Sequence, residues 1–429
     1  MLEQLTKHYP IGAYYLSEKL WTPDGVRQFA ETGSDFLVSV RPNQALTDLC
    51  KQHGIGIFSI GSFSMWWGGD GGNAGGYEAF FPLQTLDHAA GTLPSNPPVW
   101  GDYLVDEPNA RDFAHIDRVV RRYRALFPDR IPFINLYPNY ASIAGTPGEQ
   151  VVSQLGTVSY AEHIERYLRE IDLPYLCFDF YPFTGEAGGP FDRYLENLDI
   201  AADACRRSSR ALWVIIQAGA WKPEEAISTF QLRWQVGLCL AYGARSLMHA
   251  SYSKGWWDDS TACVNADGAK NPMYNDVATV NREVHAVGSD YLNYRSTGVS
   301  VCGDLSRAHP RIRVQLERQA LRPNEQNLDP IAKISSDAAI LTGTFRSTQG
   351  RFALLLVNTQ DPWNAAASAD VRLQPAVGFV ILHQREHKEV LPVPAEGLTL
   401  HLASGDWAFV ELLPGTANPP LYPAVSEPI

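Results

Sequence analysis

Basic residues are scarce in this chain of 429 residues, with 35 Lys and Arg against 47 Asp and Glu and a formal net charge of −12. Nucleic acid and anionic membrane surfaces are not expected as partners, because both are bound through clustered positive charge. No segment is apolar over the ~20 residues that a membrane-spanning helix needs. The N-terminal residues do not resemble a signal peptide. We therefore expect a cytoplasmic protein, or a periplasmic or secreted one if a signal peptide has been removed.

Cysteine is also rare. The six cysteines show no CxxC spacing and no accompanying histidine pattern, which a zinc site or a redox motif would require. Several fall in apolar runs, where a free thiol behaves as a small buried hydrophobic group. We expect no metal, no cofactor and no disulfide framework.

Aromatic residues, by contrast, are abundant. The chain has 11 Trp and 19 Tyr, and several lie in loops rich in Gly or Asp. Exposed aromatic rings stack well on sugar rings, although most aromatic side chains in any protein belong to its core. A carbohydrate is therefore the expected partner, and a homo-oligomer is compatible with the composition of a globular protein.

Strand-like and helix-like runs alternate through the first two-thirds of the chain. The eight expected strands cover residues 11–16, 36–40, 55–60, 100–105, 131–136, 175–180, 212–217 and 246–250. Apolar residues at helical spacing predict helices over 23–32, 44–52, 113–127, 161–171, 191–206, 224–242 and 276–287. Eight such units predict an α/β fold of the (β/α)₈ TIM-barrel type. The passage 65–96, rich in Gly, Trp and Asp, leaves the third helix unassigned.

The last third of the chain has a different pattern. Short strand-like runs cover 352–358, 378–382, 398–402 and 407–413, separated by Gly, Pro, Asn and Asp. Such spacing predicts an all-β sandwich. We expect a barrel over 1–295, a C-terminal β-sandwich over 296–415 and a loosely ordered tail over 416–429.

The fourth expected strand ends in two adjacent carboxylates, in the run Trp100-Gly-Asp-Tyr-Leu-Val-Asp-Glu-Pro-Asn109. Barrel enzymes carry their active sites at this end of the strands. Cleaving an acetal needs a protonated donor and a second carboxylate that attacks the sugar or activates water. Adjacent strand residues point to opposite faces, so Glu107 is the expected acid and Asp106 is expected to orient a loop or a neighbouring strand.

Polar and aromatic residues gather at the other strand exits as well. Amides and carboxylates grip sugar hydroxyls, and aromatic rings stack on sugar faces. The expected substrate-binding residues are Arg41, Trp66, Trp67, Asn135, Tyr137, Tyr181, Gln217, Trp221, His249, Trp256 and Trp257.

The sequence resembles glycoside hydrolases of the clan A barrel type, nearest to family 42 β-galactosidase-like domains. The resemblance is carried by Tyr103-Leu-Val-Asp-Glu-Pro108, by Asn275…Val280-Asn-Arg-Glu283…Gly288 and by Gly405-Asp-Trp-Ala-Phe-Val-Glu-Leu412. It implies that Glu107 is the acid/base. It also implies a nucleophilic glutamate at the end of the seventh strand, where this chain has Gln217. An amide cannot form the glycosyl-enzyme ester.

Asp179 is the expected second carboxylate, because it ends an apolar run on the sixth strand, where an unpaired charge would be costly. The sequence thus predicts a glycoside hydrolase with Glu107 as general acid or acid/base and Asp179 as nucleophile or base. A transglycosylase would use the same pair. Two alternatives stay open: a non-catalytic carbohydrate-binding barrel, favoured by Gln217, and a polysaccharide lyase using Arg41, Tyr181 and His249.

Overall fold

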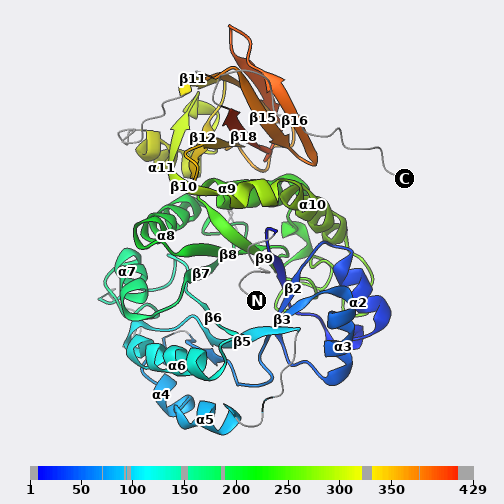
Figure 1. The fold of residues 1–429 in the computed structure, drawn as a ribbon, viewed down its shortest axis with the longest axis vertical. Helices are drawn as coiled ribbons and strands as arrows, with labels where there is room; N and C mark the ends of the chain where they lie inside the picture. Colours follow the sequence, from blue (N-terminus) through cyan, green and yellow to red (C-terminus); the bar gives the residue numbers. More distant parts are fainter. Residues whose placement is uncertain are drawn as a thin grey trace.

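The computed structural model describes residues 8–69, 71–90, 93, 98–145, 153–184, 189–320, 331–375 and 377–413. Figure 1 shows a ring of helices around a closed parallel sheet, with a β-rich part stacked on one side of the ring. The expected tail over 416–429 lies outside the described residues. Within them, no helix is long and apolar enough to cross a membrane.

All eight barrel strands expected from the sequence are present. They are β1 (Ile11–Tyr14), β2 (Phe36–Val40), β3 (Gly56–Ser59), β5 (Val99–Asp106), β6 (Ile131–Asn135), β7 (Tyr175–Phe180), β8 (Ala211–Gln217) and β9 (Ala244–Ala250). Neighbouring strands pair in parallel, and β9 returns to pair with β1. Between β6 and β7 the ring closes through a parallel bridge from Leu136 to Phe178. The TIM-barrel prediction is therefore confirmed.

Helices surround this sheet. They are α2 (Pro23–Ala30), α3 (Gln44–His53), α6 (Phe113–Leu126), α7 (Tyr160–Glu170), α8 (Tyr194–Ser208), α9 (Thr229–Ala241) and α10 (Pro272–Leu292). In the unassigned third unit stand a two-residue strand and two short helices, β4 (Trp66–Trp67), α4 (Tyr77–Phe80) and α5 (Gln84–Ala90). Strand β4 adds to the edge of β5, so this passage lies directly beside the fourth barrel strand.

The C-terminal part contains two antiparallel sheets and the helix α11 (Pro310–Ala320). One sheet has the order β10-β12-β13-β18-β15-β16 and the other β11-β14-β17. Their strands are β10 (Tyr294–Cys302), β11 (Ile331–Ser336), β12 (Ile340–Ser347), β13 (Phe352–Asn358), β14 (Ala369–Pro375), β15 (Phe379–Gln384), β16 (His387–Pro392), β17 (Leu398–Leu402) and β18 (Trp407–Leu413). The predicted β-sandwich is confirmed, and the expected boundary at 295/296 falls inside β10.

The sandwich has its own apolar core, and its larger sheet also packs on the barrel. Leu356, Val371 and Val410 belong to the core between the two sheets. On the outer face of the larger sheet, the Phe409 ring lies 5.7 Å from Tyr291 of α10. Trp407 lies so close to Gly237 of α9 that a Cβ there would come within 2.9 Å of it. The two parts therefore share a tightly packed seam.

Candidate functional site at the carboxyl ends of the barrel strands

A β-bulge in β5, the fourth barrel strand, determines the direction in which the carboxylates of this strand point. Between Tyr103 and Val105, two residues of β5 stand opposite one residue of β6, and such a bulge redirects the side chains that follow it. Asp102 lies on the helix side, where it accepts a hydrogen bond from Tyr123. Asp106, after the bulge, bonds instead to Tyr103, whose ring packs on Tyr14 inside the barrel. The bulge brings Asp106 into the barrel mouth.

Glu107 follows with a left-handed backbone conformation, φ +50°. Its N–H donates to the carbonyl of Asn135 at 2.9 Å, which fixes this strained turn to the next strand. The Trp67 indole N–H donates to Glu107 Oε2 at 3.0 Å. Gly68 is needed for this approach, because a Cβ there would lie 1.7 Å from the Glu107 carbonyl oxygen. Strand β4 therefore positions the Glu107 carboxylate from one side.

Asn135 connects two carboxylates from different strands. Its Nδ2 donates to Asp106 Oδ1 at 3.0 Å and to Asp179 Oδ1 at 2.8 Å. The two carboxylate oxygens are thus at most about 6 Å apart, near enough for the charge on one to oppose ionisation of the other. The hydroxyl of Tyr181 also bonds to Asp179. Among the described residues, no group bonds to the buried Oδ1 of Asn135.

Burial and mutual repulsion disfavour ionisation of this pair. The pKa of Asp179 is raised to about 7, first by burial and then by the negative charge of Asp106, while the bonds from Asn135 and Tyr181 oppose the rise. Burial also raises the pKa of Asp106, against the bonds from Tyr103 and Asn135. Two coupled carboxyls of this kind hold a proton at neutral pH. The site therefore contains a protonated donor next to accessible oxygen atoms.

Two tyrosines that the sequence reasoning did not select border this cluster. Tyr14, on β1, donates to the Tyr103 hydroxyl at 3.2 Å. Burial raises the pKa of Tyr140, and the charges of Asp179 and Glu107 raise it further, so this ring lies near both carboxylates. The two-residue alternation of β1 identifies Tyr14 rather than Tyr15 as the inward residue, and Tyr140 follows directly after the exit of β6. Both signals were present in the sequence.

Aromatic side chains form part of the mouth. Trp256 is half-exposed and meets Tyr14 and Tyr181 at centroid distances of 6.0 and 6.1 Å. Trp257 is buried, donates its indole N–H to the Ala250 carbonyl and packs against the exposed Trp221. Of the two expected tryptophan pairs, one member of each, Trp67 and Trp256, is exposed next to the cluster. The buried Trp257 therefore supports the exposed ring of Trp221.

Gln217 and His249 do not reach the mouth. Gln217 is 0 % exposed; its Oε1 accepts from the Phe183 N–H and its Nε2 donates to the Gly219 carbonyl. His249 is 1 % exposed and shares a 2.7 Å hydrogen bond with Asn281 Oδ1. Burial lowers the pKa of His249 to about 4. In this structure both side chains hold the barrel wall, and direct substrate contact by either stays a prediction.

Three further expected binding residues have other roles or positions. Trp66 turns away from the mouth and packs on Phe80 at a centroid distance of 4.9 Å. The Tyr137 hydroxyl is buried and donates to the Gly69 carbonyl, which holds the loop after β4. Both contacts stabilise the loops around the mouth, and substrate binding by Trp66 and Tyr137 stays a prediction. Arg41 is exposed after β2, and no contact between its guanidinium and the three carboxylates is seen among the described residues.

Two groups of described side chains away from the strand exits have the spacing of metal ligands: His8, Asp35 and His285, and Asp290, His383 and Glu411. Both groups form hydrogen-bonded networks. In the first, His8 bonds to Asp35, and in the second, Lys388 neutralises Asp290.

No family model and no curated protein matches this chain. Several solved structures, however, match this chain. An alpha-amylase from Geobacillus thermoleovorans, crystallised with acarbose, is 9% identical over 96% of this chain and 99% of its own, with a TM-score of 0.51. A family 39 glycoside hydrolase from Bacteroides cellulosilyticus is 13% identical over 95% and 82%, with a TM-score of 0.47. An endo-beta-1,4-mannanase from Thermotoga petrophila is 10% identical over 82% and 95%, with a TM-score of 0.45. At such low identity the similarity to the amylase shows the fold: the chain is a (β/α)₈ barrel with a C-terminal β-sandwich.

Proposed function

We propose that the protein is a glycoside hydrolase that cleaves glycosidic bonds of an oligo- or polysaccharide with the carboxylates Glu107 and Asp179. The observation that carries this proposal is the cluster of Asp106, Glu107 and Asp179 at the strand exits, with two of them bridged by Asn135. Fold alone does not determine function. The argument therefore rests on the chemistry of these side chains.

The pKa values favour a different division of roles from the one expected from the sequence. A general acid must carry a proton near neutral pH, and Asp179 meets this condition with a pKa raised to about 7. Asp179 then donates its proton to the glycosidic oxygen as the bond to the anomeric carbon breaks. Glu107, part-exposed and oriented by Trp67, is the second carboxylate. It either attacks the anomeric carbon or removes a proton from the attacking water.

The surroundings suit a sugar. The half-exposed rings of Trp67 and Trp256 offer apolar faces near the cluster, and sugar rings stack on such faces. A family 42 relationship and a transglycosylase activity remain proposals that share this cluster. The carbohydrate-binding alternative keeps its argument, because β8 ends in Gln217 rather than a glutamate, and an activity assay separates it from a hydrolase.

A panel of aryl glycosides with different sugars and anomers tests the proposal. We expect the wild-type protein to release the aryl alcohol from at least one of them. Glu107→Gln should lower kcat/KM by at least roughly 10³-fold on every substrate that is cleaved, and Asp179→Asn should do so where the aryl leaving group is weakly acidic. Glu165→Gln on the outer face of α7 removes an equivalent exposed charge and should leave the rate unchanged. Undiminished turnover by Glu107→Gln would refute the assignment, and binding without turnover across the panel would instead establish a binding protein.

A further inference from the structure

A second polar cavity lies at the opposite end of the barrel from the carboxylate cluster. It has a volume of about 300 Å³ and is bordered by the end of α8, the starts of β8 and β9, and the start of β10. Four arginines line it: Arg206, Arg210, Arg245 and Arg295. No carboxylate is among its described lining residues. In a chain with a net charge of −12, this concentration of positive charge calls for an explanation.

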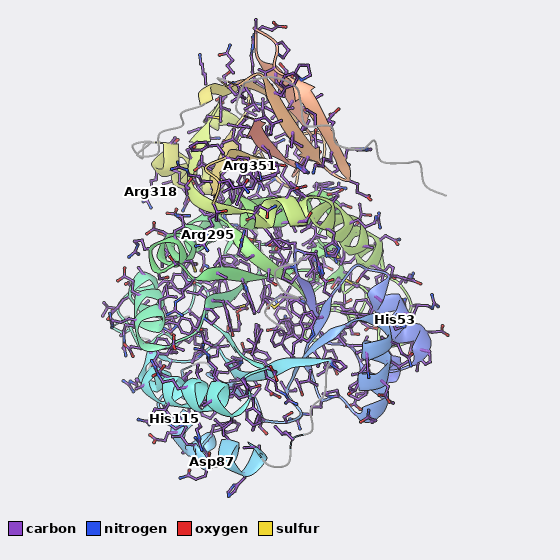
Figure 2. The ribbon with its side chains drawn as sticks, in the orientation of Figure 1. His53, Asp87, His115, Arg295, Arg318 and Arg351 are labelled. Carbon is purple, nitrogen blue, oxygen red and sulfur yellow. The ribbon has the colours of Figure 1, made fainter. Side chains whose placement is uncertain are left out.

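The nearest carboxylates neutralise these arginines weakly. Asp203 lies 3.5 Å from Arg206 and Asp172 lies 3.9 Å from Arg210, both at the outer range of an ion pair. For Arg245 and Arg295, no described carboxylate comes within 4.0 Å. Figure 2 labels Arg295 where the chain passes from the barrel to the C-terminal sheets. Two of the four cations therefore have no counter-ion in the part of the chain that the structure describes.

Arg245 is the least expected of the four. Its guanidinium donates to the carbonyls of Tyr294 at 2.7 Å and Leu292 at 2.8 Å, which satisfies two N–H groups but leaves the charge uncompensated. Burial lowers the pKa of Arg245, and the nearby charge of Arg295 lowers it further. Arg245 is partly buried and Arg295 is exposed, and a partly buried charge is stabilised by a paired opposite charge. Two neighbouring arginines without a described carboxylate therefore favour a bound anion.

Unused hydrogen-bond donors occur at the same place. Among the described residues, Ser296 Oγ and Arg206 Nη1 are buried and have no hydrogen-bond partner. The negative C-terminal end of the α8 dipole accounts for Arg206 and Arg210. It does not account for Arg245 and Arg295, which stand on strands β9 and β10. The strand arginines and the unused donors therefore indicate a bound group with several acceptor atoms.

A larger cavity adjoins the first. It has a volume of about 720 Å³ and shares Pro174, Ala211 and Arg245 with it. Leu173 and Trp213 belong to its lining, and Trp213 stacks on Tyr175 with ring centroids 4.1 Å apart and planes 9° apart. Its lining also includes Arg121, Arg124, Arg130 and Asp172. The second space therefore has an apolar side at Leu173 and Trp213, where an apolar or aromatic body could lie, and a charged side.

We propose that the two cavities together bind a phosphate monoester with an aromatic body. The phosphate occupies the small cavity between Arg206, Arg245 and Arg295, and the body lies along the Trp213 side of the larger one. A phosphate carries about −1.5 to −2 charge and three strong acceptor oxygens, which matches several guanidinium forks better than a single carboxylate would. This site is independent of the proposed hydrolase activity.

Calorimetric titration of the full chain with phenyl phosphate, inorganic phosphate and phenol tests the proposal. Phenyl phosphate should bind more tightly than inorganic phosphate, and phenol should not bind. Arg295→Gln and Arg206→Gln should each weaken phenyl phosphate binding by at least roughly tenfold. Arg207→Gln is the matched control, because Arg207 is the next residue on α8, pairs with Asp203 and Glu165 and does not line the cavity. It should change the affinity by less than about twofold.

Three results would overturn the proposal. They are absence of phenyl phosphate binding to the wild-type protein, equal affinity of the Arg206 and Arg207 variants, and equal affinity for phenyl phosphate and inorganic phosphate. Circular dichroism of each variant verifies its fold. Thermal unfolding gives a second readout, because a ligand that binds only the folded state raises Tm. That rise should be present in wild type and Arg207→Gln and reduced in Arg295→Gln.

Discussion

Asp106 and Asp179 accept hydrogen bonds from the same amide nitrogen, Nδ2 of Asn135, although they end strands β5 and β7 with β6 between them. The two carboxylates are held close together in a buried site, so the negative charge of Asp106 opposes ionisation of Asp179. This relationship links the pKa of the proposed proton donor to a neighbour that the sequence did not mark as catalytic.

Removing the Asp106 charge should shift the pH dependence of the reaction. Asp179 is active as a donor while protonated, so the rate should fall as pH rises through about 7. Asp106→Asn removes a charge that raises the pKa of Asp179. The pH at which kcat falls on the alkaline side should therefore be lower by about one pH unit. Asp117→Asn, on the outer face of α6, should leave this pH unchanged, and an unchanged value in Asp106→Asn would count against the coupling.

Trp67→Phe should impair catalysis, whereas Trp66→Phe should not. The first change removes the indole N–H that donates to Glu107 Oε2. The second leaves the apolar packing on Phe80 and removes an indole nitrogen that has no hydrogen-bond partner among the described residues. Loss of one orienting bond to a charged group is worth about 1.5–3 kcal/mol, or roughly 10- to 150-fold in kcat/KM. Equal rates in the two variants would contradict the positioning role of Trp67.

Gly68→Ala should destabilise the protein. A Cβ at this position would lie 1.7 Å from the Glu107 carbonyl oxygen, a backbone atom that cannot move without displacing the turn. We expect a loss of about 2 kcal/mol or more in the free energy of unfolding. Gly72→Ala is the control, since nothing lies within 4 Å of a Cβ there. Urea unfolding of both variants measures the difference, and a loss shared equally by both would contradict this reading of the turn.

His249→Gln should change how stability depends on pH. The pKa of His249 is lowered to about 4 in the folded protein, against about 6.5 in an unfolded chain. The unfolded state binds more protons between these values, so the His249 contribution is complete above 6.5 and is lost as pH falls towards 4. The stability advantage of wild type over the variant should shrink by about 2 kcal/mol between pH 7.5 and 4.5. Denaturant titrations at the two pH values measure this change; a constant difference would mean that His249 does not titrate as proposed.

The barrel was predictable because its strands are continuous apolar runs between amphipathic helices. Of the β-sandwich, β13, β17 and β18 matched closely and β15 within two residues, whereas β10, β11, β12, β14 and β16 were not predicted. Strand β12 contains Gly343 between polar residues, and it becomes a strand through pairing with β10 and β13 rather than through its own preference. The helix α11 was also missed.

The site was only partly predictable. Glu107 and Asp179 were identifiable as acids at strand exits. The position of Asp106 was not, because strand alternation fails at a bulge, and the bulge depends on the pairing of Tyr103 and Val105 with β6. Gln217 also sits at a strand exit, yet it is buried because the Phe183 N–H and the Gly219 carbonyl come from loops that fold over it. The contact with Phe183, 34 residues away in the chain, leaves no local signal in the sequence.

The leaving-group dependence of Asp179→Asn tests the central claim most directly. If Asp179 protonates the glycosidic oxygen, the variant should retain near wild-type kcat on a glycoside with a very acidic aryl leaving group and lose roughly 10²–10⁴-fold on one with a weakly acidic leaving group. Glu107→Gln should be inactive on both. A uniform loss in Asp179→Asn, together with a leaving-group-dependent loss in Glu107→Gln, would reverse the two roles and contradict the account.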